Sequence, residues 1–170
     1  RGASGTEFSK IDYNGLKNMH DLLSPALFIL EFGGNSIPYM KTKESCERYG
    51  KRFKKQIQKL QKINPEAQFI VIGPGDMSTK NKTELITYPL LINVRDELRD
   101  VALETNSCFW DMYLNMGGEN SIQEWAKEDP ALAAKDYIHF TNLGARKIAD
   151  MFISDLMEDY KSFKMNNSNE

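Results

Sequence analysis

The stretch Ala26-Leu27-Phe28-Ile29-Leu30-Glu31-Phe32, followed by Gly33-Gly34-Asn35, decides the fold class of this 170-residue chain. It is an almost unbroken apolar run, whereas a strand with one solvated face would alternate apolar and polar residues. The run therefore predicts a strand that is covered on both faces, as in a parallel sheet. The glycines and asparagine that follow are residues that tolerate a positive φ and end strands.

Working outward, the chain alternates between strands and helices. Apolar runs at 68–73 and 108–111 predict two further strands, and amphipathic spacing predicts helices over 9–23, 43–63, 89–105 and 142–160. In the helix over 43–63, apolar residues recur every three or four positions, at Tyr49, Phe53, Ile57 and Leu60. The polar segment 79–84 reads as a loop. This alternation predicts a single α/β domain with helices on both faces of a mostly parallel sheet.

Composition excludes several classes of function. Hydrophobic residues make up 41% and charged residues 27%, and the net charge is -2, so neither nucleic acid nor an anionic membrane is expected as a partner. No apolar run approaches the roughly 20 residues of a membrane-spanning helix, and no signal peptide is visible. Two cysteines, Cys46 and Cys108, predict two separate buried thiols, and the sparse, scattered histidines and cysteines predict no metal site.

The stretch Asp136-Tyr137-Ile138-His139 carries one of the chain's two histidines. A carboxylate one turn before a histidine can fix the tautomer of the imidazole and prepare it to act as a general base. The alternative is a histidine that caps or approaches the start of the helix after it. Ligands of parallel sheets bind beyond the carboxyl ends of the strands, where the turns after the first two strands also belong.

Three short blocks, at 1–5, 33–35 and 136–139, resemble blocks that occur in the same order in the SGNH hydrolase superfamily, also called the GDSL esterases and lipases. Gly33-Gly34-Asn35 looks like the Gly-x-Asn block, Asp136 to His139 looks like the Asp-x-x-His block, and 1–5 resembles the glycine block. The segments 73–78 and 109–118 are similar to bacterial carbohydrate esterases of this superfamily, which remove O-acetyl groups from peptidoglycan or other glycans.

The resemblance implies a three-layer α/β/α sandwich with a flavodoxin-like sheet and a role for each matching residue. His139 would be the general base and Asp136 would orient it. The side chain of Asn35 and the backbone N–H of Gly2, with Gly5 as the alternative, would donate to the oxyanion. No cofactor or metal is implied, the substrate would be an acylated carbohydrate or another small ester, and the location would be periplasmic or extracellular.

The serine block of the superfamily has no counterpart in the chain. Ser4, Ser36 and Ser78 lie near the expected site but do not occupy the position of the nucleophile. Three strands are also few for a chain of this length. We therefore expect residues 1–162 to be the C-terminal part of one SGNH domain, with a polar tail at 163–170. The strand with the serine would precede Arg1, as a missing segment or a separate polypeptide, and would pair with the edge at 26–32.

Two other functions remain open. One is a lipase, lysophospholipase or thioesterase of the same superfamily, and the other is a non-catalytic glycan-binding protein. Asp76 could line the site or serve the turn in which it lies. Trp110, Tyr113 and Trp125 could stack on a sugar or simply pack in the core.

Overall fold

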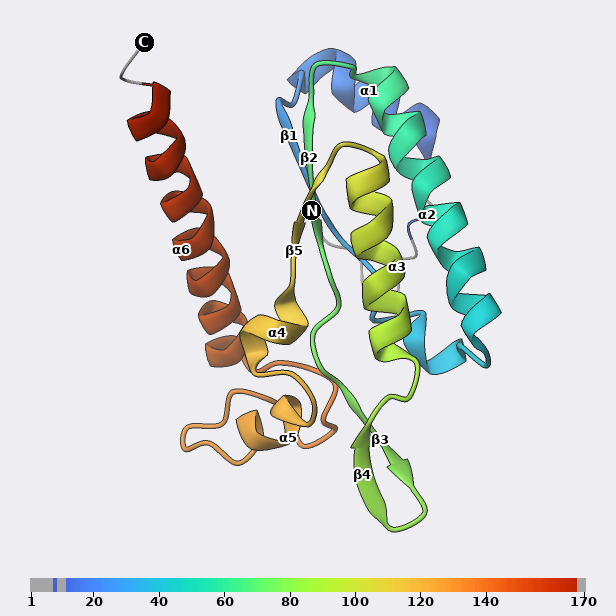
Figure 1. Ribbon diagram of the computed structural model, residues 1–170, viewed down its shortest axis with the longest axis vertical. Helices are drawn as coiled ribbons and strands as arrows, with labels where there is room; N and C mark the ends of the chain where they lie inside the picture. The colour runs from blue at the N-terminus through green and yellow to red at the C-terminus, as the bar shows by residue number, and fades with distance from the viewer. Residues whose placement is uncertain (1–7, 9–11, 168–170) are drawn as a thin grey trace.

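The computed structural model describes Phe8 and residues 12–167 as an α/β domain of three layers (Figure 1). The middle layer is a parallel sheet in the order β1-β2-β5, with bounds Leu27–Glu31, Gln68–Ile72 and Cys108–Trp110. Helices α2 (Lys43–Ile63) and α3 (Leu91–Glu104) cover one face, and α6 (Asn142–Asn167) lies on the other. The predicted α/β class and the parallel sheet are confirmed.

Smaller elements lie at the two ends of the sheet. Helix α1 (Tyr13–Leu23) precedes β1 at the amino ends of the strands. At the carboxyl ends are the 3-10 turn η2 (Ile37–Tyr39), the antiparallel hairpin β3–β4, and the short helices α4 and α5. The hairpin strands are β3 (Ser78–Asn81) and β4 (Glu84–Thr87), and the short helices are α4 (Met112–Met116) and α5 (Ser121–Trp125). The sheet thus has one end closed by α1 and one end built from loops.

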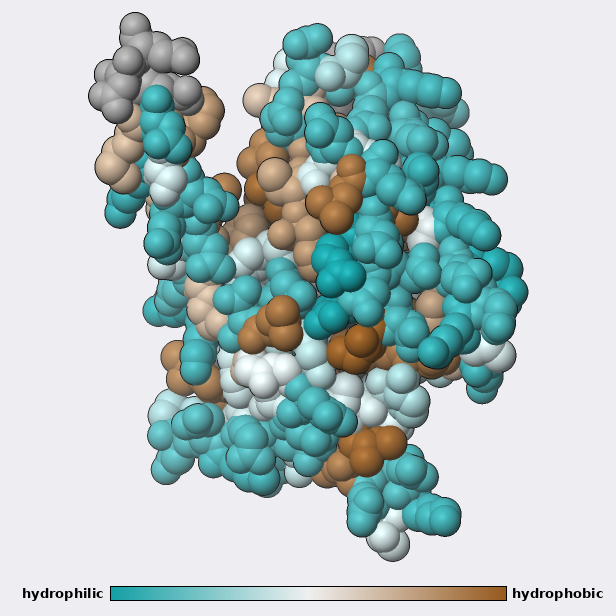
Figure 2. Space-filling model, viewed as in Figure 1, coloured by the Kyte–Doolittle hydropathy of each residue, from teal (hydrophilic) through white to brown (hydrophobic). Residues whose placement is uncertain are grey.

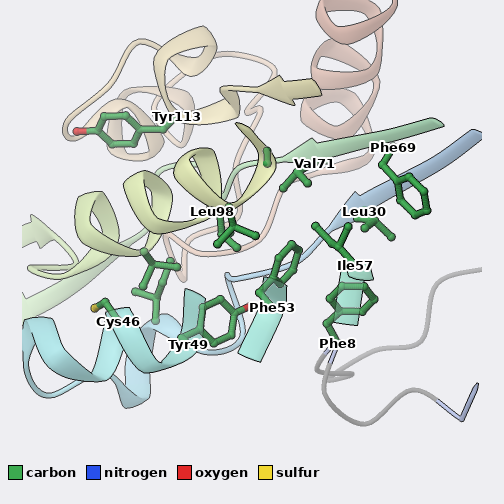
Figure 3. Packing of buried hydrophobic residues seen from close by; sticks show 14 of the residues in the cluster. Phe8, Leu30, Cys46, Tyr49, Phe53, Ile57, Phe69, Val71, Leu98 and Tyr113 are labelled. Carbon is green, nitrogen blue, oxygen red and sulfur yellow. The ribbon is translucent and has the colours of Figure 1, made fainter. Parts of the chain in front are cut away.

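The alternation of side chains along β2 divides the core into two clusters. Phe69 and Val71 pack with α2 and α3, whereas Ile70 and Ile72 pack on the opposite face with residues of α6. Figure 3 shows side chains of α2 and α3 pointing at the first of these faces. Four of the five residues of β2 are buried, so β2 is covered on both faces, as a central strand of a parallel sheet should be.

Strand β1 is less covered than its sequence predicts. Among the described residues it pairs only with β2, and Leu27 and Ile29 are 42% and 49% exposed. Both lie on the side of α6, but α6 packs instead over β5, where Phe152 and Asp155 contact Trp110. The prediction that both faces of this strand are covered is therefore wrong for the face toward α6.

Three local predictions also need correction. The segment 79–84 is not a loop but the centre of the β3–β4 hairpin, which reverses at Lys82 with φ 55° and without a glycine to mark the turn. Helix α6 runs to Asn167, beyond the predicted end at residue 160, because no proline or glycine interrupts it after Gly144. Cys108 is exposed, since it opens the edge strand β5, whereas Cys46 is buried and both thiols are free. The division of the chain at residue 162 stays a prediction.

Within the described part of the chain, no helix has the length and apolarity that crossing a bilayer requires.

Candidate active site

A cavity of about 370 Å³ lies at the carboxyl ends of the strands. Its walls come from the segments that follow β1, β2 and β5 and from the loop before α6. Asn35 and His139 both line it, although they are more than 100 residues apart in sequence. The structure therefore brings two of the four residues with a predicted role into one cavity, at the edge where α/β sheets bind ligands.

A third predicted residue, Asp136, holds the imidazole of His139. The distance between Oδ2 of Asp136 and Nδ1 of His139 is 2.8 Å, and Oδ1 of Asp136 accepts from the backbone N–H groups of Ile138 and His139 at 3.0 Å each. Partial burial opposes ionisation, but these hydrogen bonds and the charge of the imidazole outweigh it and lower the pKa of Asp136 to about 2. The carboxylate stays charged at neutral pH and leaves Nε2 as the free nitrogen of the ring.

The backbone around His139 is fixed at several points. The N–H of Ser78, the first residue of β3, donates to the carbonyl of Tyr137 at 2.8 Å, and the N–H of Ala134 donates to the carbonyl of His139 at 2.8 Å. Tyr137 has a φ of 57°, which lets the chain turn so that the carboxylate and the imidazole face each other. The position of the imidazole is thus tied to the start of β3.

Thr141, rather than His139, caps α6. Its hydroxyl accepts from the N–H of Gly144 at 3.2 Å and donates to the carbonyl of Ala131 at 2.8 Å. A Cβ on Gly144 would lie 1.9 Å from the carbonyl oxygen of Leu132, so only glycine allows this close approach. The alternative in which His139 serves as a helix cap is therefore wrong.

The turn after β1 presents Asn35 to the cavity. Gly33 has a φ of 118°, and its carbonyl accepts from the N–H groups of Ser36 and Ile37. A Cβ on Gly33 would approach the side chain of Leu98 to 3.2 Å. Asn35 itself is exposed on the cavity side of this turn. Gly2 and Gly5, the two candidates for a backbone donor, lie outside the described residues.

Asp76 lines the cavity but uses both of its oxygens in the structure. It is 2% exposed, and its carboxylate accepts from the hydroxyl of Thr87 at 2.7 Å and from the N–H of Ile122 at 3.0 Å. Burial raises the pKa of Asp76, against the effect of these hydrogen bonds. Its geometry fits the structural alternative, because it ties the hairpin and α5 to the end of β2.

The aromatic residues considered for sugar stacking, Trp110, Tyr113 and Trp125, are each buried to more than nine-tenths. Their packing in the two core clusters favours the alternative in which they stabilise the fold.

The cavity contains two groups that the sequence did not single out, Glu31 and Tyr39. Glu31 could have been found from the sequence, because it is the one charged residue in the apolar run 26–32. Neighbouring side chains shield this carboxyl partly from water and raise its pKa.

No serine in the described residues acts as a partner of His139. Ser36 lines the cavity, but no hydrogen bond joins its hydroxyl to the imidazole, and the hydroxyl of Ser78 accepts from Gln123 instead. Nor do Phe8 and residues 12–167 contain a group of three or more metal-ligating side chains. The described site thus holds an imidazole paired with a carboxylate, and no serine hydroxyl is bonded to this pair.

The sequence matches no known family profile and no curated protein, but solved structures resemble the chain closely. A peptidoglycan O-acetylesterase is similar over 93% of the chain, with a TM-score of 0.77 and 24% identity. An acetyl xylan esterase has a TM-score of 0.63 and 21% identity over 91% of the chain. A GDSL-like lipase from Parabacteroides merdae has a TM-score of 0.63 and 18% identity over 91%.

The chain has the SGNH hydrolase fold. It spans 45% of the length of the peptidoglycan O-acetylesterase, 78% of the acetyl xylan esterase and 70% of the lipase. The fold that the resemblance implies is confirmed, but identities of 24% and below leave the chemistry of the site to be argued from its own residues.

Proposed function

We propose that the protein is a serine-type carboxylic ester hydrolase that removes O-acetyl groups from carbohydrate. The contact between Asp136 and His139 at the wall of the cavity carries this proposal. The carboxylate binds Nδ1, so the imidazole presents Nε2 as the base that takes a proton from a serine hydroxyl. The same nitrogen later protonates the leaving sugar oxygen, and Asp136 stabilises the charged imidazole between the two steps.

The oxyanion of the tetrahedral intermediate needs donors that are already in place. Asn35 has an exposed amide on the same cavity as His139, and its turn is fixed by Gly33. We assign one donor to this amide and a second to the backbone N–H of Gly2. The lining of the cavity is mixed, with Glu31, Asn35 and Tyr39 beside Phe32 and Phe140, which suits a sugar better than a long acyl chain.

We place the nucleophile on a segment outside these 170 residues. The outer edge of β1 has no partner strand among the described residues, and Leu27 and Ile29 on this strand are exposed. A parallel strand added there would lie about 4.8 Å from β1. Its carboxyl end would reach the cavity beside Asn35, where a serine could meet Nε2 of His139. The same strand would pair the open backbone edge of β1, which otherwise invites aggregation, and its connection would cover Leu27 and Ile29 on the face toward α6.

Labelling of the full-length protein with a fluorophosphonate tests the proposal, together with hydrolysis of 4-nitrophenyl acetate. We expect a single labelled serine outside residues 1–170 and hydrolysis that labelling abolishes. The 170-residue chain alone should be inert in both assays. A full-length protein that neither labels nor hydrolyses the ester would instead be a non-catalytic glycan-binding protein. A label on Ser36 would contradict the assignment of the nucleophile to another segment.

A further inference from the structure

A second hollow of about 220 Å³ adjoins the candidate active site. Both cavities share Ser36, Tyr39 and Tyr49 as lining residues, so they meet at these residues. The other side of the second hollow is formed by α2, and its base includes Phe8 and Phe53, each 2% exposed. The hollow thus has an apolar base and lies within the reach of a ligand bound at His139.

Only some of the basic residues of α2 line this hollow. Helix α2 contains six lysines and two arginines, and only the arginines, Arg48 and Arg52, line the hollow. None of the described residues that line it is acidic. The lysines lie elsewhere on the helix, as expected of a solvated face.

The two guanidinium groups can act on one ligand. Arg48 and Arg52 are four residues apart, so their Cβ atoms lie about 6 Å apart on one face of the helix. Within the described residues neither forms an ion pair with a carboxylate within 4.0 Å. Two acids lie near the arginines along α2. Glu47, next to Arg48 in sequence, does not line the hollow, and Glu44, one turn before Arg48, is engaged by the side chain of Thr42.

Hydroxyl groups complete the polar lining. The hydroxyl of Ser36 forms no hydrogen bond within the described part of the chain, and Tyr39 is 77% exposed at the boundary between the two hollows. Arginine presents a planar fork that binds carboxylate and phosphate through two parallel hydrogen bonds, and an apolar base strengthens such contacts. The combination of fork donors, hydroxyls and an apolar base is suited to an oxyanion carried by a larger molecule.

We propose that the hollow with Arg48 and Arg52 is a subsite for an anionic group, a carboxylate or a phosphate, of the same acylated substrate whose ester lies at His139. This inference rests on the proposed function, because it assigns the substrate class of that site. Neutral acetylated sugars would then bind through the ester alone. Acidic sugars or sugar phosphates would gain the contacts of both arginines.

Equilibrium binding to the full-length protein tests the subsite without any turnover. The probes are glucose, glucuronate and glucose 6-phosphate, which share the ring and differ in the anionic group. We expect at least one anion to bind about tenfold more tightly than glucose, and this preference to weaken as ionic strength rises. The tighter of the two anions identifies carboxylate or phosphate as the group recognised.

Variants of α2 test whether the two arginines cause the preference for the anionic sugar. Arg48→Gln/Arg52→Gln should abolish the preference for the anion, whereas Lys59→Gln/Lys62→Gln removes the same charge from the other half of α2 and should keep it. Arg52→Lys keeps the charge and loses the fork, so it should weaken the preference even if the double variant folds poorly.

Equal binding of all three sugars, or no detectable binding of either anion, would overturn the subsite. So would an unchanged preference in Arg48→Gln/Arg52→Gln. Hydrolysis of 4-nitrophenyl acetate does not require an anionic group. A protein that fails to hydrolyse this ester would therefore contradict the proposed esterase function and not the anionic subsite.

Discussion

Asp136 is the residue on which the orientation of the candidate base depends. Its two oxygens accept three hydrogen bonds, two from backbone N–H groups and one shared with the imidazole of His139. All three partners lie within the four residues 136–139, so the pairing is built locally. This is why the spacing Asp-x-x-His could be interpreted from the sequence, whereas the contribution of Ser78 to the same loop could not.

The titration of Asp136 tests this arrangement. Because the hydrogen bonds lower its pKa to about 2, the carboxyl should titrate well below 3.8, the ordinary pKa of an aspartate, in NMR spectra of its side-chain carbon. A depressed carboxyl pKa stabilises the folded state above the unfolded pKa. That contribution should disappear as pH falls from about 4 through about 2.

His139→Ala is the matched variant for this titration. It removes the side-chain bond and the imidazole charge but keeps the backbone N–H donors, so the pKa of Asp136 should rise part of the way toward 3.8. A midpoint near 3.8 in the unaltered protein would contradict the geometry of the pair.

At the scale of elements, the cavity depends on where each strand ends and where α6 begins. The apolar runs of β1 and β2 and the periodicity of α2 made these elements predictable to within a residue or two. The β3–β4 hairpin was not predictable, because its strands are polar and its turn at Lys82 contains no glycine. The exposure of β1 was also missed, since local apolarity cannot tell which strand lies at the edge.

Gly144 fixes the start of α6 against the loop of the site. Gly144→Ala should destabilise the protein by about 2 kcal/mol or more in urea unfolding, because the new Cβ meets the backbone of Leu132, which cannot rotate away. Gly34→Ala is the control, since a Cβ there has no heavy atom within 4 Å. Equal stability of the two variants would show that α6 does not approach Leu132 as closely as the structure indicates.

At the scale of the whole molecule, apolar surface remains open on the side of α6. Figure 2 shows the far end of this helix standing clear of the body, with brown apolar surface beside the sheet. Exposed apolar residues occur on both elements, namely Leu27 and Ile29 on β1, and Ile153, Met157, Tyr160 and Phe163 on α6. A parallel sheet with a partly uncovered face is unusual, which is why we expect a further strand at the edge of β1 and a connection that covers this face.

Hydrogen exchange of β1 tests this expectation. Peptides covering residues 26–32 should take up deuterium rapidly in the 170-residue chain, where β1 has one partner strand. In the full-length protein, pairing of the outer edge should slow their exchange by about 100-fold or more. Peptides from β2, which is already paired on both edges, serve as the internal control. Equal exchange of β1 in both proteins would contradict a strand at this edge.

The central claim, that His139 is the base of a serine esterase, is tested most directly by the turnover of His139→Ala in the full-length protein. The rate of 4-nitrophenyl acetate hydrolysis should fall by at least about 10³-fold, since a serine without its base is a weak nucleophile. His20→Ala, which changes the other histidine at the opposite end of the sheet in α1, should retain full activity. A His139→Ala variant that turns over within about twofold of the unaltered enzyme would contradict the account.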